Sequence, residues 1–188
     1  IGTRYMKGGL GYGGPCFPND VKAFISLSEQ YGQSPHLLSA CQEVNEFQNE
    51  NLLNLVLEYA QIQNETTISI MGLSFKPQTP VINGSAGLIL IKKLLESGLG
   101  VCVYDPLALE NVRNVFDDKI QYTGSVVECF MRSSVCVITT PDEVFSTIDG
   151  AYIQKKPTTV IDCWRILGPA KFKSDVNYIG LGRFRSPK

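Results

Sequence analysis

The residues with the clearest chemical potential lie near the start of the chain, in a glycine-rich segment that leads to a cysteine. Residues 8–20 read GGLGYGGPCFPND. Glycines let a backbone approach a ligand closely and expose amide N–H groups, so such a loop could wrap a sugar or a diphosphate. Cys16 lies just before an expected helix, whose positive end favours a nucleophilic thiolate. Asp20 falls one helical turn further on, near enough to orient a water. On composition alone, a glycine-rich turn with an incidental cysteine is an equally good interpretation.

Two helices are expected to position this loop. Asp20 is typical of an N-cap for a helix through about Tyr31, and Gly32 is a natural stop. Ser34-Pro35 begins a second helix, in which apolar residues recur at helical spacing up to about Ile62. A helix of this length exceeds what a small domain usually needs. We therefore expect a dimerisation helix, and the alternative is a helix that packs only on its own domain.

From Gln63 onwards, short apolar runs rich in β-formers alternate with helical patterns. The expected strands are residues 67–73, 101–104, 120–122, 135–139, 159–162 and 177–179, and the expected helices are 85–97, 108–116, 126–132 and a short one after Pro141. Repeated strand–helix units predict an α/β fold with a doubly wound, mostly parallel sheet. The chain should therefore divide into a catalytic loop with a helical region (residues 1–62) and an α/β domain (residues 63–188).

Sheets of this kind bind ligands at the carboxyl ends of their strands, and three expected strand ends carry polar residues. These ends are residues 74–77, 105–106 and 162–165. No Gly-x-Gly-x-x-Gly follows a strand, so a self-sufficient dinucleotide fold is not supported. Residues 83–87 (NGSAG) open a helix where an anion could sit, although a simple N-cap at Asn83 or Ser85 is the more ordinary interpretation.

Composition excludes several classes of function. The 17 basic and 18 acidic residues give a net charge of −1, so the chain lacks the excess of basic residues that nucleic-acid-binding proteins carry. No apolar run is long enough for a membrane span. The absence of a Cys-x-x-Cys pair argues against a metal site. Five cysteines lie in apolar segments, and we expect them to be buried and free, as in a reducing, cytoplasmic compartment: Cys41, Cys102, Cys129, Cys136 and Cys163.

Four segments together resemble the motifs of the UDP-glucose/GDP-mannose dehydrogenase family. Residues 11–20 (GYGGPCFPND) are similar to its catalytic loop, G-[FY]-G-G-S-C-[FL]-P-K-D. Residues 72–79 (GLSFKPQT) resemble its G-L-x-F-K-P-x-T motif, and Ile1-Gly2 the tail of its R-I-G motif. Residues 162–165 (DCWR) resemble its late D-x-R motif, with one more residue between the aspartate and the arginine. The order and the separations match along the whole chain.

The resemblance implies a Rossmann-like sheet domain that binds a UDP-sugar, a homodimer, and an NAD-binding domain that precedes these motifs and binds most of the cofactor. It also implies a reaction, the oxidation of the sugar C6 alcohol to a carboxylate by two NAD⁺ through a cysteine thiohemiacetal and a thioester. In this interpretation Cys16 is the nucleophile and Asp20 helps to activate water. The implied substrate-binding residues are Tyr5, Met6, Lys7, Gly8, Gly9, Gly13, Lys76 and Arg165.

The sequence departs from the family pattern where the cofactor is bound. Asn19 stands where the family usually has Lys, and Asn83 stands in place of an Asp-x-Arg pattern whose arginine reaches the cofactor. Arginine–phosphate contacts are stronger than neutral ones, so NAD would be held differently here. The alternatives are a nucleotide-sugar-binding module without turnover, a pure dimerisation module, and a GDP-mannose or UDP-N-acetylhexosamine dehydrogenase. Arg165 could equally be a surface residue.

Overall fold

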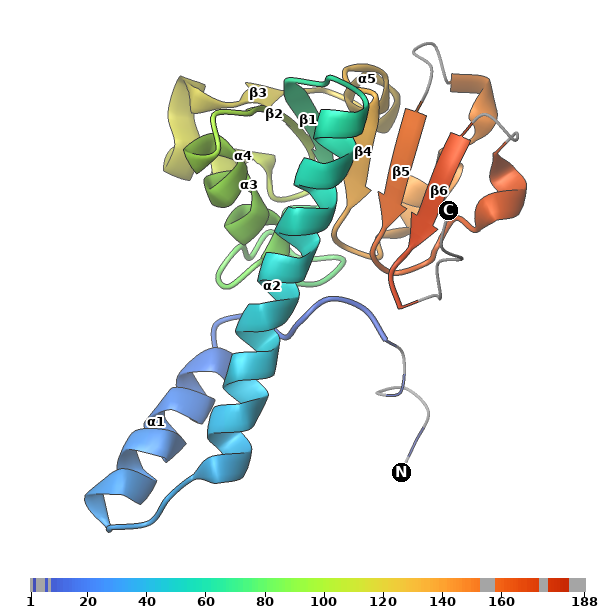
Figure 1. Ribbon diagram of the computed structural model, residues 1–188. Coiled ribbons are helices and arrows are strands. Elements are labelled where there is room, and N and C mark those ends of the chain that lie inside the picture. The colour runs from blue at the N-terminus through green and yellow to red at the C-terminus, as the bar shows by residue number, and fades with distance from the viewer. Residues whose placement is uncertain (1, 3–5, 7, 153–157, 173–175, 183–188) are drawn as a thin grey trace.

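The computed structural model describes residues 2, 6, 8–152, 158–172 and 176–182. Helices α1 (Phe17–Gln30) and α2 (His36–Ile62) run side by side as a hairpin that projects from a sheet domain. The second half of α2 lies against that domain, and its first half extends away from it with α1 (Figure 1). Tyr5 and Lys7, both expected to bind substrate, lie outside the described residues.

Helix α1 begins four residues earlier than the sequence predicted, since its N-cap is Cys16 and not Asp20. Cys16 has no side-chain capping hydrogen bond, and Pro18 lies in the first turn. A proline fits there because its fixed φ suits the helix and its missing N–H would have no partner in the helix. The expectation of an N-cap at Asp20 is therefore wrong. Asp20 lies inside the first turn, and its backbone N–H donates to the Cys16 carbonyl at 2.9 Å.

Six parallel strands form one sheet in the order β3-β2-β1-β4-β5-β6. The strands are β1 (Thr67–Met71), β2 (Gly100–Tyr104), β3 (Gln121–Tyr122), β4 (Val135–Ile138), β5 (Thr158–Asp162) and β6 (Val176–Gly180). The helices of the domain are α3 (Ala86–Glu96), α4 (Leu109–Phe116) and α5 (Val126–Met131), with short 3-10 turns at Asp117–Lys119, Glu143–Thr147, Gly150–Tyr152 and Pro169–Lys171. This is the strand order of a Rossmann fold, and the predicted doubly wound α/β class is confirmed.

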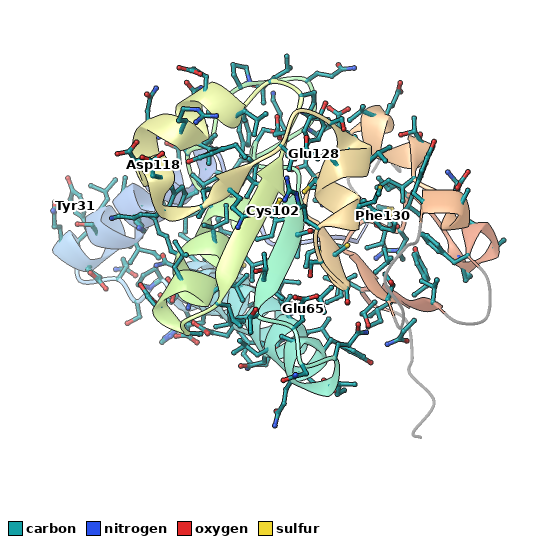
Figure 2. The ribbon with its side chains drawn as sticks, turned by 90° about the horizontal axis from the view of Figure 1, so that it is seen from above. Tyr31, Glu65, Cys102, Asp118, Glu128 and Phe130 are labelled. Carbon is teal, nitrogen blue, oxygen red and sulfur yellow. The ribbon has the colours of Figure 1, made fainter. Side chains whose placement is uncertain are left out.

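Alternate residues of the strands face two separate cores. Ile68 and Ile70 pack with α2, α3 and α4 on one face, whereas Met71 packs with α5 on the other. Figure 2 shows Cys102 in the middle of the domain, beside the helix that carries Phe130. Because both faces are covered, the last four residues of β1 and all four residues of β4 are buried.

Four of the cysteines expected to be buried are buried, and all six thiols are free. Cys102, Cys129 and Cys136 share the core on the α5 side, and Cys163 lies in the other core. The expectation was wrong for Cys41, which is exposed. Cys41 belongs to the half of α2 that extends beyond the sheet domain (Figure 1), where Leu37, Val44 and Phe47 are also exposed.

Candidate active site

The carboxyl edge of the sheet is built around the connection between β1 and α3. The strand order changes direction between β1 and β4, and open parallel sheets bind ligands at such a topological switch point. Thr140, just after β4, donates its hydroxyl to the Ser74 carbonyl at 2.9 Å. Asp105, just after β2, is buried, and its carboxylate accepts hydrogen bonds from the backbone amides of Leu73, Ser74, Leu107 and Ala108.

Asp105 occupies the place at which a dinucleotide-binding sheet presents an acid to a ribose. Here the chain's own amides fill both of its carboxylate oxygens. Asp105 therefore stabilises the start of the β1–α3 connection through its hydrogen bonds with Leu73 and Ser74. Together with the missing glycine fingerprint, this means that the described residues do not form a dinucleotide site by themselves.

The glycine-rich loop crosses this edge and is anchored to it at three points. At one end, the Arg165 guanidinium donates to the Gly8 carbonyl. Next, the indole of Trp164 packs on Gly9, where a Cβ would overlap the ring, and its Nε1 donates to the Thr139 carbonyl at 2.9 Å. These contacts tie the loop to the ends of β4 and β5.

The third anchor lies close to Cys16. The backbone N–H of Gly14 donates to the Asn83 carbonyl at 2.9 Å, and a Cβ at Gly13 would overlap the Gly84 carbonyl. Gly14 has φ +91° and faces the Phe75 ring, so a side chain there would be both strained and obstructed. At least three of the loop's glycines are thus required for close packing of the loop on the domain.

Cys16 follows this anchor and is exposed at the start of α1, with Asp20 also exposed one turn later. Lys76 is exposed on the β1–α3 connection, with its Nζ 5.3 Å from the centroid of the Phe75 ring. Because that ring touches Gly14, the lysine, the glycine loop and the thiol lie along one edge. Met6 is 71% exposed and has no assigned contact with this group.

Arg165 is partly buried and is held in an uncommon backbone conformation, with φ +59°. Its guanidinium also donates to the Leu181 carbonyl at 2.6 Å. A cavity of about 690 Å³ lies beside it, between the loop, the end of β6 and α2. Two of the five guanidinium N–H groups suffice for these bonds, which leaves donors for an anionic ligand.

The two positions expected to contact the cofactor carry no charge. The Asn19 side-chain amide donates to the Pro15 carbonyl at 3.0 Å, within its own turn of helix. Asn83 contributes its carbonyl to the loop anchor, and the N-cap of α3 is Ser85, whose hydroxyl accepts from Leu88. Their roles toward NAD stay predictions.

Sequence reasoning did not find the residues that hold the loop from α2. Asn45 donates its side-chain amide to the Tyr12 carbonyl at 3.1 Å. Tyr12 lines a cavity together with Cys41 and Asn45 of α2. Burial, and then the nearby Cys41 and Glu46, raise the pKa of the Tyr12 hydroxyl. Gln48, Asn51 and Asn54 follow Asn45 at intervals of three and line the large cavity. This polar spacing on a helix was the available signal.

Comparison with known proteins decides the family. The sequence model of the UDP-binding domain of the UDP-glucose/GDP-mannose dehydrogenase family matches residues 69–169, and that of its central domain matches residues 1–47. The chain belongs to this family.

Individual members of the UDP-glucose/GDP-mannose dehydrogenase family match most of the chain. The UDP-glucose 6-dehydrogenase AglM of Haloferax volcanii is 35% identical over 167 residues, which cover 89% of this chain and 38% of that protein. TuaD of Bacillus subtilis, also a UDP-glucose 6-dehydrogenase, is 31% identical over 140 residues, or 74% of this chain and 30% of that protein.

A solved structure of the family superposes closely. A UDP-glucose dehydrogenase from Pyrobaculum islandicum gives a TM-score of 0.85 at 29% identity, and the match covers 96% of this chain and 40% of that one. The matches therefore span only 30–40% of the length of these relatives. In the described residues, no helix has the length and apolarity needed to cross a membrane.

Proposed function

We propose that this chain supplies the catalytic loop and the nucleotide-sugar-binding domain of an NAD-dependent nucleotide-sugar 6-dehydrogenase, with UDP-glucose as the first choice of substrate. The observation that carries the proposal is the docking of the glycine loop on the carboxyl edge of the sheet, which leaves Cys16 exposed at the start of α1. Residues 1–62 would form the catalytic and dimerisation region, and residues 63–188 the UDP-sugar domain.

In this reaction two molecules of NAD⁺, bound chiefly by residues outside this chain, would each accept one hydride from C6 of the sugar. The chain's own part begins when the Cys16 thiolate adds to the C6 aldehyde and forms a C–S bond. Loss of a hydride from this thiohemiacetal leaves a thioester. Water, oriented by Asp20, then breaks the C–S bond, releasing the carboxylate and the free thiol. Covalent capture keeps the reactive aldehyde on the protein between the two oxidations.

The remaining residues would bind and orient the sugar nucleotide. Gly8, Gly9 and Gly13 would line it with backbone, as would Met6, while Lys76 and Arg165 would supply positive charge toward the diphosphate. Asn19 and Asn83 would meet the cofactor without charge. A homodimer is part of the proposal, because the hairpin exposes Phe24, Leu27 and Phe47.

The test is NADH formation by the full-length protein with UDP-glucose, GDP-mannose and UDP-N-acetylhexosamines. We expect two NADH for each sugar oxidised, loss of product with Cys16→Ala, and retention of activity with the matched control Cys41→Ala, because both thiols are exposed. A protein that binds a UDP-sugar without forming NADH would refute turnover and favour a binding module.

A further inference from the structure

A side-chain hydrogen bond from Asn45 connects α2 to the glycine loop that precedes Cys16. The Asn45 Nδ2 donates to the Tyr12 carbonyl at 3.1 Å, across 33 residues of sequence. The three other anchors of the loop, at Gly8, Gly9 and Gly14, come from the sheet domain. Tyr12 lies between the last two of these anchors and four residues before Cys16, and its carbonyl is held from α2 instead of from the sheet domain.

The orientation of the Asn45 amide follows from its partner. A carbonyl oxygen accepts hydrogen bonds, so the group that faces Tyr12 must be the NH₂. The amide oxygen Oδ1 is then turned away from Tyr12, is inaccessible to solvent, and has no hydrogen-bond partner among the described residues. An unsatisfied buried oxygen is costly, which argues that the amide is kept here for the bond made by its nitrogen.

Gly11 explains how this amide fits beneath the loop. A Cβ at Gly11 would overlap Oδ1 of Asn45 and would lie 3.0 Å from its Cγ. Gly11 is not among the glycines with a positive φ, so the missing side chain serves the approach of Asn45 and not an unusual backbone conformation. Asn45 and Gly11 are therefore packed directly against each other, and a larger side chain at position 11 would collide with the Asn45 amide.

We propose that Asn45 is a positioning residue, which holds the Tyr12 carbonyl and thereby sets the reach of the Cys16 thiol toward the sugar. This inference rests on the proposed role of Cys16. The substrate end of the loop is anchored independently through Arg165 and Trp164. Loosening the loop at Tyr12 should therefore disturb the chemical step more than the binding of the sugar nucleotide.

Asn45→Asp keeps the shape of the side chain but replaces the donor with a carboxylate that faces the Tyr12 carbonyl. We expect kcat of the full-length protein to fall about 10- to 100-fold, because small misplacements of a reacting group have effects of this size. KM for the sugar nucleotide should change by less than about threefold. The matched control is Asn49→Asp, one turn along α2, where the amide donates to the Asn45 carbonyl of the helix itself.

Two further measurements keep the test decisive if Asn45→Asp folds poorly. Gly11→Ala should lower kcat in the same way, whereas Gly11→Ala combined with Asn45→Ala should be no worse than Asn45→Ala alone, because the new methyl fills the vacated space. In a Cys41→Ala background, the rate of iodoacetamide labelling of Cys16 in the 188-residue chain should also change with Asn45→Asp and not with Asn49→Asp.

Additive effects of Gly11→Ala and Asn45→Ala, equal effects of the two aspartate variants, or a rise in KM with unchanged kcat would overturn the inference. Failure of the proposed function would look different, since the unmodified full-length protein would then form no NADH. The labelling comparison would still report whether Asn45 controls Cys16.

Discussion

Ile91 on α3 and Phe24 on α1 are both apolar residues on amphipathic helices, yet Ile91 is fully buried and Phe24 is 60% exposed. The same contrast holds for whole regions. Every strand of the sheet domain contributes to one of two cores or is packed against them, whereas no residue of α1, all of which is described, is buried. In Figure 2, Tyr31 lies at the outer end of the hairpin, far from Cys102 in the centre of the domain.

The difference teaches where each region obtains its stability. The sheet domain buries its own apolar side chains, and its own backbone amides donate hydrogen bonds to the buried carboxylate of Asp105. The outer hairpin presents apolar side chains that a monomer leaves in water. The proposed dimer would cover them, and the glycine loop lies at the junction of the two regions, held by Asn83 of the sheet domain and by Asn45 of α2.

The largest expected effect is on folding stability. Ile91→Ala should lower the free energy of unfolding of the 188-residue chain by about 2–5 kcal/mol, because it removes buried methyl groups and leaves a cavity. Phe24→Ala should lower it by less than about 0.5 kcal/mol when a monomer unfolds. Urea unfolding at low protein concentration measures both, and similar losses would show that the hairpin is packed within a single chain.

The next largest effect is on association. Phe24→Asp should weaken the dimer at least about thirtyfold, as expected for an aromatic residue at the centre of an interface. Val115→Asp is the control, since Val115 is a 48% exposed apolar residue on α4 of the sheet domain. Sedimentation equilibrium would decide: a monomeric parent chain, or a Phe24→Asp variant that remains as dimeric as Val115→Asp, would contradict the account.

A smaller effect separates the cysteines of the two regions. Cys16 and Cys41 should react with a disulfide reagent at least about tenfold faster than the four buried thiols. The hydrogen bond with Cys102, and then burial, raise the pKa of the Cys129 thiol well above its ordinary value, and burial does the same for Cys163. Four slow thiols that react only on unfolding are expected, and rapid reaction of all six would contradict the separation.

The smallest effect concerns the loop at its substrate end. Gly9→Ala places a methyl group against the Trp164 indole and would push the loop away from this anchor, so we expect KM for the sugar nucleotide to rise about three- to tenfold with little change in kcat. The control is Gly124→Ala, where the nearest atom to a new Cβ is 3.8 Å away. Equal kinetics for the two variants would show that Trp164 does not constrain the loop.

Much of the sheet domain could be predicted from sequence, because alternating buried positions and helix caps are local signals. Ser85 and Gly32, for example, mark helix ends in sequence and do so in the structure. The prediction that Cys41 is buried was wrong. An apolar stripe on a helix indicates that another surface covers it, but that surface need not belong to the same chain. The predicted start of α1 was wrong because aspartate is a more typical N-cap residue than cysteine, which favoured Asp20 over Cys16.

The sequence could propose candidate residues only where the residue type itself suggests chemistry, as for Cys16 and Lys76, whose roles stay predictions. Asn45 and Trp164 could not be found in this way, because their contacts with Tyr12 and Gly9 join segments separated by 33 residues and by most of the chain. The requirement for glycine at positions 9, 11 and 13 likewise depends on neighbours from distant segments.

The most direct test of the central proposal is to look for the covalent intermediate on Cys16. The full-length protein would be mixed with NAD⁺ and UDP-glucose, quenched in acid during turnover, digested and analysed by mass spectrometry. The account predicts a UDP-glucuronyl thioester on the peptide that contains Cys16, absent from the Cys16→Ala variant. Steady NADH formation with no adduct at Cys16, or with an adduct at Cys41, would contradict it.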